Sequence, residues 1–234
     1  MHGPRGAGRG GRCPFAGCWP SAHTRVTPRH ARQRTPVHDA RHPARMTWYD
    51  KLNAYFPIEE MKSKEHVEAL LAERSDVYRI DQGPNHVLLY VEGTDFTFVD
   101  YLLVTAGARG QGLGRTLLDR LKAIGKPILL EVEPASYEDT DTVKRHRFYE
   151  REGFRRAESF TYRRRSLATG EENDLEILYW SPDPSTSDAD IYAHMRAIYE
   201  HVHTWRDREF YGESYQPADE VLRLGDGPAG SPTN

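Results

Sequence analysis

A short glycine-rich segment at residues 109–114, RGQGLG, is the part of this sequence whose residue types and spacing best suit chemistry. It follows a β-branched and aromatic run at 96–105, typical of a buried strand, and it precedes leucines at helical spacing from 113 to 121. The N-terminus of a helix presents unpaired backbone N–H groups and a dipole that favour an anion. Glycines lack a Cβ and so let a phosphate approach the backbone. The segment therefore predicts a site for a phosphorylated cofactor.

Two common phosphate-binding loops fit this segment poorly. The Rossmann fingerprint G-x-G-x-x-G would need its third glycine one residue later than Gly114, and the Walker loop needs a Lys-Ser or Lys-Thr that is absent here. The segment instead fits the pattern R-x-x-G-x-G through Arg109, Gly112 and Gly114. In this pattern it resembles the pyrophosphate loop of the GNAT superfamily of acetyl-CoA-dependent N-acyltransferases.

A second motif supports the same resemblance. Residues 148–154, FYEREGF, are similar to the F-Y-x-x-x-G-F helix end of that family, and a strand-like run at 127–133 separates the two motifs. The resemblance covers roughly residues 95–160. It implies an α/β (α+β) fold with a mixed, mostly antiparallel central sheet flanked by helices. It also implies that acetyl-CoA is the cosubstrate, without a metal, and that the reaction is acetyl transfer to a primary amine.

The resemblance also assigns the contacts to coenzyme A. Backbone amides of the glycine loop would bind the pyrophosphate, and two arginines would add positive charge. The end of the preceding strand would pair its backbone with the pantetheine arm. The predicted cofactor-binding residues are Leu103, Val104, Arg109, Gly110, Gln111, Gly112, Leu113, Gly114 and Arg115.

The helix that ends near Tyr149 carries the predicted general acid. The resemblance places Tyr149 where the family often has the group that protonates the departing thiolate. A tyrosine near a helix end is also typical of a core residue, so this role depends on geometry. Arg145, one turn earlier, stands where the family usually has alanine. This arginine either contacts coenzyme A phosphates or is solvated.

The catalytic base is left open among three carboxylates. Several family members place a Glu on the strand before the loop, where this chain has Phe98, and Asp100 follows on the same strand face. Glu131 and Glu133 share one face of the next strand. Asp100 and Glu131 are favoured. A carboxylate buried in a strand either shifts its pKa upward or finds a partner, and structural ion pairs produce the same sequence pattern.

Charge divides the chain of 234 residues into two unlike parts. Residues 1–45 contain nine arginines and one acid, whereas residues 46–234 carry a net charge of −11. The first part is too poor in periodic apolar residues to fold, and Met46 is predicted to be the true start. The predicted parts are a disordered tail at 1–45, an acetyltransferase domain at 46–182, a C-terminal helical extension packed on the domain at 183–224, and a disordered tail at 225–234. Both cysteines, Cys13 and Cys18, lie in the first tail, so direct attack by the amine is the simplest mechanism.

Hydrophobic periodicity predicts the remaining elements. Helical spacing indicates an amphipathic helix at 58–74, in which Ser63 would cap a turn, and a second at 187–204 whose apolar stripe packs on the domain. Alternation and turn residues predict strands at 77–80 and 86–92, which would precede the 96–104 strand as an antiparallel meander. They also predict a hairpin of strands at 158–166 and 174–180. The arginine run at 163–165 is predicted to be an exposed strand edge, and the alternative is that it binds an anionic group locally.

Composition restricts the class of partner. The acidic domain disfavours general binding of nucleic acid, and no apolar run reaches the roughly 18 residues of a spanning helix, which predicts no membrane insertion. The expected location is cytoplasmic, the expected partner is a small-molecule or peptide amine, and a homodimer is one expected assembly. The alternative function is a non-catalytic acyl-CoA-binding sensor or assembly module acting through the 187–204 helix. An Arg/Gly-tailed nucleic-acid binder is the least favoured hypothesis.

Overall fold

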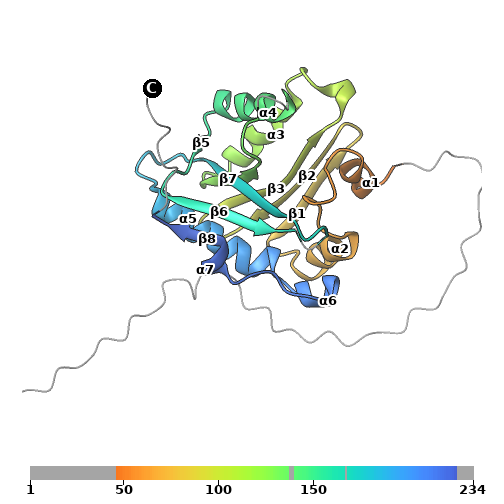
Figure 1. Cartoon of the computed structure of the whole chain (residues 1–234). Helices are drawn as coiled ribbons and strands as arrows, with labels where there is room; N and C mark the ends of the chain where they lie inside the picture. Colours follow the sequence, from red (N-terminus) through yellow and green to blue (C-terminus); the bar gives the residue numbers. More distant parts are fainter. Residues whose placement is uncertain (1–45, 137–139, 167, 226–234) are drawn as a thin grey trace, which may run out of the picture. The chain divides into compact units, whose positions relative to one another are not determined.

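The computed structural model describes residues 46–136, 140–166 and 168–225. Eight strands form one sheet in the order β1-β2-β3-β4-β7-β6-β8, with β5 paired to β7 beside this path (Figure 1). The strands are β1 (Tyr78–Gly83), β2 (His86–Glu92), β3 (Thr97–Val104), β4 (Ile128–Val132), β5 (Arg155–Arg156), β6 (Phe160–Arg165), β7 (Glu172–Trp180) and β8 (Leu222–Leu224). The helices are α1 (Trp48–Asn53), α2 (Lys64–Glu73), α3 (Leu113–Lys122), α4 (Thr140–Arg151), α5 (Asp188–Ile198), α6 (Asp207–Tyr211) and α7 (Ala218–Val221), with a 3-10 turn at Ala106–Ala108 and a π-helical turn at Tyr199–His203. The predicted tail at 1–45, both cysteines and residues 226–234 lie outside the described residues.

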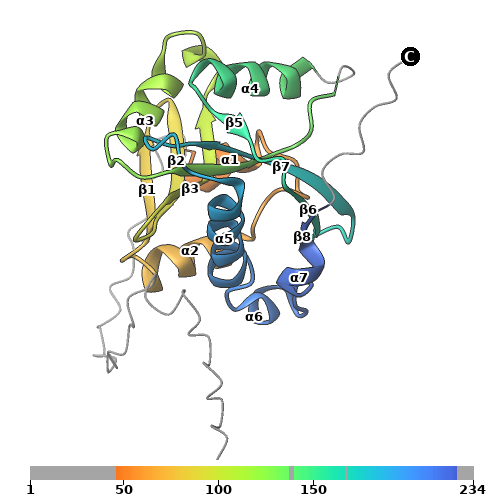
Figure 2. The same cartoon turned by 90° about the vertical axis from the view of Figure 1, so that its left-hand side faces the viewer.

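The sheet is mixed and mostly antiparallel. Among the described strands, β3 and β4 form the one parallel pair, and every other pairing is antiparallel. Helices cover both faces: α3 and α4 lie on one side of the sheet, and α2, α5 and α6 lie on the other (Figure 2). The predicted fold class is therefore confirmed.

A β-bulge interrupts the predicted meander of β1, β2 and β3. Leu89 faces Tyr101 and Tyr90 faces Val99, so Asp100 is an extra residue without a partner on β2. A bulge shifts the alternation of a strand by one residue and bends it. It follows that Asp100 lies where β3 bends, one residue beyond the last pairing of β3 with β4 at Val99.

The parallel strands β3 and β4 pair over a short length only. Their register runs from Thr97 opposite Ile128 to Val99 opposite Leu130. Beyond that point β3 stays paired with β2 and β4 stays paired with β7. The two strands therefore part, and the end of β3 lies just before the glycine loop.

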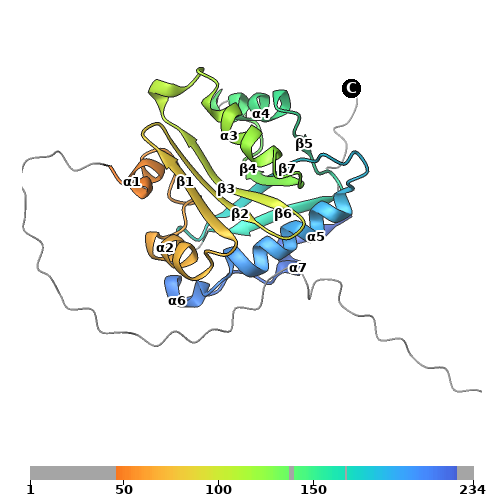
Figure 3. The same cartoon turned by 180° about the vertical axis from the view of Figure 1, so that it is seen from behind.

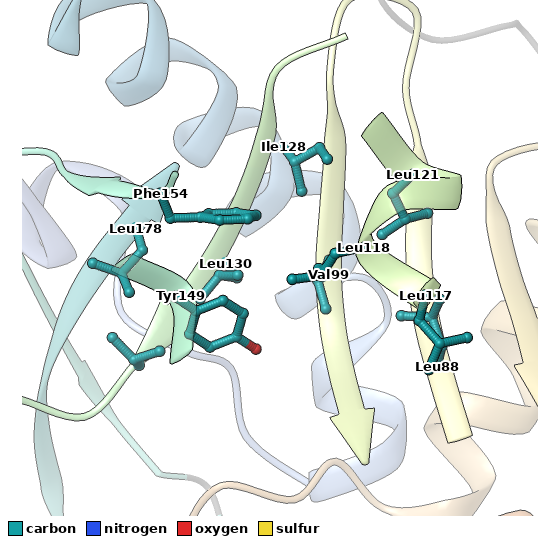
Figure 4. Close-up of a cluster of buried hydrophobic side chains, with 11 residues drawn as sticks. Leu88, Val99, Leu117, Leu118, Leu121, Ile128, Leu130, Tyr149, Phe154 and Leu178 are labelled. Atoms are coloured by element: carbon teal, nitrogen blue, oxygen red, sulfur yellow. The ribbon is translucent and has the colours of Figure 1, made fainter. Parts of the chain in front are cut away.

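A cluster of buried apolar side chains holds α3 and α4 on the sheet (Figure 4). Leu117 and Leu118 of α3 are fully buried, and Tyr149 and Phe154 at the end of α4 pack into the same cluster. Protein interiors are close-packed, so such a cluster fixes the helices with little freedom. The loop before α3 and the side chain of Tyr149 are thereby held in place relative to β3.

The predicted helix at 58–74 begins later than expected. Residues 57–61 form turns, in which Glu60 N–H donates to the carbonyl of Pro57, and the helix starts at Lys64. Ser63 is its N-cap, because the Ser63 hydroxyl accepts a hydrogen bond from the backbone N–H of His66. Met61 is buried as predicted, but it is buried from a loop rather than from a helix. Apolar residues of the loop before α2 happen to continue the helical spacing, so the predicted helix began six residues too early, at residue 58 instead of Lys64.

The C-terminal extension packs on the sheet through its apolar stripe. Ile191, Met195 and Ile198 of α5 are fully buried. The π-helical turn after α5, the short helices α6 and α7, and the strand β8, which pairs with β6, were not predicted. A three-residue strand shows too little alternation to be recognised from sequence. Within the described part of the chain, no helix is long and apolar enough to cross a membrane.

His66 joins α2 to α6, which lie side by side (Figure 3). The imidazole is fully buried, its Nδ1 is 3.0 Å from the hydroxyl of Tyr211, and its ring stacks on Phe210 at 4.9 Å. Burial, together with the nearby positive charge of Lys62, lowers the pKa of His66 to about 3. The folded protein therefore keeps this imidazole neutral at pH values where the unfolded chain protonates it.

Acid should destabilise the fold through His66. Below pH 6.5, the usual pKa, the unfolded state binds a proton that the folded state does not bind until about pH 3. The free energy of unfolding should fall by about 2 kcal/mol between pH 6.5 and about pH 5 from this group alone. Urea unfolding of wild type and His66→Gln at several pH values measures this, and the variant should lose that part of the slope. An unchanged slope in His66→Gln would contradict the argument.

Candidate active site

A pocket of about 490 Å³ opens between the glycine loop, the parted ends of β3 and β4, and α4. Every predicted site residue lines it except Gln111, whose side-chain amide donates to the carbonyl of Gly107 at 2.9 Å. The predicted residues that line it are Asp100, Leu103, Val104, Arg109, Gly110, Gly112, Leu113, Gly114, Arg115, Glu131 and Tyr149. Glu133, the third carboxylate considered, lines it as well. The structure thus brings the predicted residues together, while their individual roles stay predictions.

Two glycines of the loop adopt a backbone conformation that other residues rarely adopt. Gly110 and Gly112 have φ angles of 76° and 79°, in the left-handed region. A Cβ on either residue would meet no other atom within 4 Å, so both backbones face open space. Gly112 is also the N-cap of α3 and provides no side-chain cap for the first N–H groups of the helix. This geometry suits a pyrophosphate that approaches the backbone closely.

Gly114 has a different structural reason to be glycine. A Cβ there would lie 3.1 Å from the ring of Phe148 on α4. The third glycine of the motif therefore allows α3 and α4 to pack closely. Arg109 closes the other end of the loop, because its Nε donates to the carbonyl of Val104 at 3.2 Å and its guanidinium lies 4.8 Å from the ring centre of Tyr55.

The outer half of β3 forms one wall of the pocket. Leu103 and Val104 line the pocket beyond the last paired residue of β3 and β4, Val99. On that side of β3 the register with β4 has ended, so the backbone there can pair with an extended ligand. This arrangement suits the predicted pairing of Leu103 and Val104 with a pantetheine arm.

Tyr149 reaches the pocket from α4. Its side chain is 7% exposed, and burial raises its pKa to about 12. The hydroxyl therefore carries its proton at neutral pH and can donate it. Figure 4 shows this hydroxyl pointing toward the strand that bears Val99 and away from Leu178. The position and protonation state suit a general acid.

Asp100 is held in a buried ion pair. Its two oxygens lie 2.6 Å from the ammonium of Lys62 and 2.5 Å from the hydroxyl of Tyr78, which donates to it. Burial alone would raise the pKa of Asp100, but the charges of Lys62 and His203 outweigh burial and lower it. A carboxylate in this setting is a poor proton acceptor, so the geometry disfavours Asp100 as the base.

Glu131 is held in a similar way at the end of β4. One oxygen lies 2.8 Å from Nε2 of His203, and the other accepts from Arg164 at 3.4 Å. Burial would raise the pKa of Glu131, but His203 and Arg164 hold it well below its usual range. Glu131 is therefore disfavoured as the base.

The prediction that the arginine run is exposed is wrong for Arg164, which is 8% exposed, because alternate residues of β6 face opposite sides.

The structure adds Glu60, which the sequence did not single out. Glu60 lines the pocket together with Glu133 and Arg145. Arg145 is partly buried: its side chain is 23% exposed and its guanidinium is 4.0 Å from Glu133. No local sequence motif identifies Glu60, because its charged neighbours, Glu133 and Arg145, come from the end of β4 and from α4. The sequence analysis also placed Glu60 in a helix at 58–74, whereas it lies in the loop before α2.

Comparison with known proteins agrees with this geometry. Residues 73–156 match the family model described as acetyltransferase (GNAT) domain. A Bacillus subtilis protein named "Putative acetyltransferase YjbC" is 58% identical over 179 residues, which cover 76% of this chain and 93% of that protein. A solved structure described as "Putative acetyltransferase from GNAT family from Bacteroides thetaiotaomicron" matches with a TM-score of 0.52 and 21% identity. The match covers 64% of this chain and 88% of that chain.

The two kinds of similarity carry different weight. The structural match at 21% identity shows a shared fold. The sequence match at 58% identity over most of both chains shows shared family membership. The chain belongs to the GNAT family of acetyltransferases.

Proposed function

We propose that this protein transfers the acetyl group of acetyl-CoA to a primary amine by direct attack. The observation that carries the proposal is the single pocket that joins an open glycine loop, the parted ends of β3 and β4, and the protonated hydroxyl of Tyr149. The family uses acetyl-CoA, and the loop geometry suits its pyrophosphate. Residues 46–234 contain no cysteine, which favours attack without an acyl-thiol intermediate.

The residues of the pocket have separate parts in this reaction. The amides of Gly110 to Gly114 hold the pyrophosphate, and the backbone of Leu103 and Val104 orients the pantetheine arm. The amine then attacks the thioester carbonyl between the parted strands. Tyr149 gives its proton to the thiolate as the carbon–sulfur bond breaks. Positioning and proton donation, rather than covalent catalysis, account for the rate.

The acceptor is a cationic amine in this proposal. Residues 46–234 carry a net charge of −11, and an acidic surface attracts a cation over long range. Glu60 and Glu133 place carboxylates in the pocket itself. A polyamine, an amino sugar, a lysine side chain and a peptide N-terminus all present the required ammonium group.

Cofactor binding is tested by one pair of matched variants. Gly112 and Gly125 both have a φ of 79° and open space around a Cβ, but Gly112 lines the pocket, whereas Gly125 lies beyond the C-terminal end of α3 and outside the pocket lining. Gly112→Glu and Gly125→Glu should each cost roughly 1–2 kcal/mol of stability from backbone strain. Acetyl-CoA at about 100 times its dissociation constant should add about 2.7 kcal/mol to wild type and Gly125→Glu, and nothing to Gly112→Glu. Thermal-shift titration measures this, and equal stabilisation of the two variants would rule out the loop as the cofactor site.

The acid role of Tyr149 is tested by removing its hydroxyl. Tyr149→Phe should lower kcat roughly 10²- to 10⁴-fold with acetyl-CoA and an accepted amine, because the thiolate would leave without a proton. Binding of acetyl-CoA should be unchanged. Tyr192→Phe is the control, since its hydroxyl contacts the carbonyl of Leu222 at 3.5 Å and the side chain of Arg196, and α5 lies on the other side of the sheet from α4 (Figure 2). Full turnover by Tyr149→Phe would remove Tyr149 from the mechanism.

A further inference from the structure

Glu60 is held at the pocket by the backbone around it. The hydroxyl of Tyr101 on β3 donates to the carbonyl of Glu60 at 3.0 Å and accepts from the N–H of Lys62 at 2.8 Å. The ring of Phe56 packs edge-on against Tyr101, with ring centres 5.4 Å apart. A catalytic side chain needs such support, because a loosely held group loses geometry. The connection between α1 and α2 is thus tied to β3 on both sides of Glu60.

The carboxyl group of Glu60 is poorly satisfied. Its Oε1 is buried and has no hydrogen-bond partner among the described residues. A buried polar atom without a partner is costly and usually has a functional reason. The charged groups that face Glu60 are Glu133 at the end of β4, Arg145 of α4 and the neighbouring Glu59. An ammonium group entering the pocket would supply the missing partner.

Arg145 connects Glu60 to the general acid. Arg145 and Tyr149 are four residues apart on α4 and therefore share one face of the helix. The charge of Glu60 and the hydroxyl of Tyr149 both act on the Arg145 guanidinium, and all three side chains line the pocket. A proton acceptor and a proton donor thus both lie within the electrostatic reach of one cation.

We propose that Glu60, with Glu133 and Arg145 beside it, takes the proton from the ammonium form of the acceptor. This inference rests on the proposed acetyl transfer and names the base for it. The ammonium gives one proton to the Glu60 carboxylate, which passes it to solvent. The nitrogen lone pair then forms the bond to the acetyl carbon, and the carbon–sulfur bond breaks with its electrons on sulfur. Tyr149 protonates the sulfur, and the second proton of the amine replaces the one that Tyr149 gave.

The protonation of Glu60 suits this step. Burial and the negative charge of Glu133 together raise its pKa to about 7, against the opposing positive charge of Arg145. A base with a pKa near the working pH combines a sizeable deprotonated fraction with a strong pull on the proton. Asp100 and Glu131 differ from Glu60 in this respect, because cations hold both of them ionised.

The direct test is Glu60→Gln in the full chain, assayed by thiol release from acetyl-CoA with spermidine, glucosamine and lysine peptides. Near neutral pH, kcat/KM for an accepted amine should fall roughly 10²- to 10⁴-fold, while the thermal shift by acetyl-CoA is unchanged. The deficit should shrink above the pKa of the amine, because the free amine needs no base. Glu59→Gln is the control, since it removes the adjacent carboxylate outside the pocket lining. It should keep most of the wild-type kcat/KM and lower the pKa of Glu60 only slightly, because the charge of Glu59 has a smaller effect on Glu60 than that of Glu133 or Arg145.

The neighbours provide a test that a merely structural Glu60 would not pass. In wild type the acid limb of kcat/KM should lie near pH 7, set by Glu60. Glu133→Gln should move this limb to lower pH, because a repelling negative charge is lost. Arg145→Gln should move it to higher pH, because a stabilising positive charge is lost. Shifts in the same direction, or a limb that survives in Glu60→Gln, would overturn the inference.

A second measurement needs no acceptor. In a ¹³C NMR titration of the glutamate carboxyl groups, the resonance missing from Glu60→Gln should titrate near pH 7 in wild type. A midpoint near the ordinary glutamate value of about 4.3 would overturn the inference and leave the cofactor proposal intact. Failure of acetyl-CoA to stabilise the wild-type protein would instead defeat the proposed function, so the two failures are distinguishable.

Discussion

The parting of β3 and β4 is the constraint on which the active site depends. Parallel pairing lasts from Thr97 to Val99 on β3, after which each strand remains bonded only to its outer neighbour. Unpaired backbone groups inside a protein are costly, so a sheet opened at its centre needs a ligand or solvent in the gap. The bulge at Asp100 bends β3 at the point where pairing ends. The positions of the glycine loop and of the β3 wall of the pocket, and the path by which the amine would reach the thioester, all depend on this opening between β3 and β4.

The C-terminal extension stabilises the floor of that opening. The turn after α5 is π-helical and brings His203, which is 1% exposed, to Glu131 of β4. A carboxylate can only accept, so His203 Nε2 carries the proton in this contact. Burial of an ion is expensive unless its partners are well placed, and removing one partner leaves an uncompensated charge. Segments far apart in the chain thus supply partners for carboxylates that the central strands would otherwise bury alone, and the extension supports the site through Glu131.

Local signals predicted most of the framework, and tertiary contacts decided the rest. The loop at 109–114, the meander and the hairpin of β6 and β7 each have turn residues and periodicity within a short window, and all three are found. Glu60 has no such signal, because its pKa depends on β4 and α4, which the sequence could not place beside it. Arg164 also lacked a local signal, because residue type does not distinguish it from Arg163 and Arg165. Only the alternation of β6 shows that Arg164 is buried while its two neighbours are more exposed.

The carboxylates of the pocket illustrate why residue type alone does not define a catalytic base. Asp100 and Glu131 occupy the strand positions that sequence reasoning favours, yet each has a cation or imidazole within hydrogen-bond distance that keeps it ionised. Glu60 has instead a second carboxylate beside it and an oxygen without a partner. Opposite charges stabilise a charge and like charges destabilise it, so groups of the same chemistry are separated into fixed anions and a titratable one. Strand carboxylates that stay ionised and stabilise the structure, Asp100 and Glu131, can therefore share one pocket with a loop carboxylate proposed to exchange protons, Glu60. The fold places cations or an imidazole beside the first two and a second carboxylate beside the third.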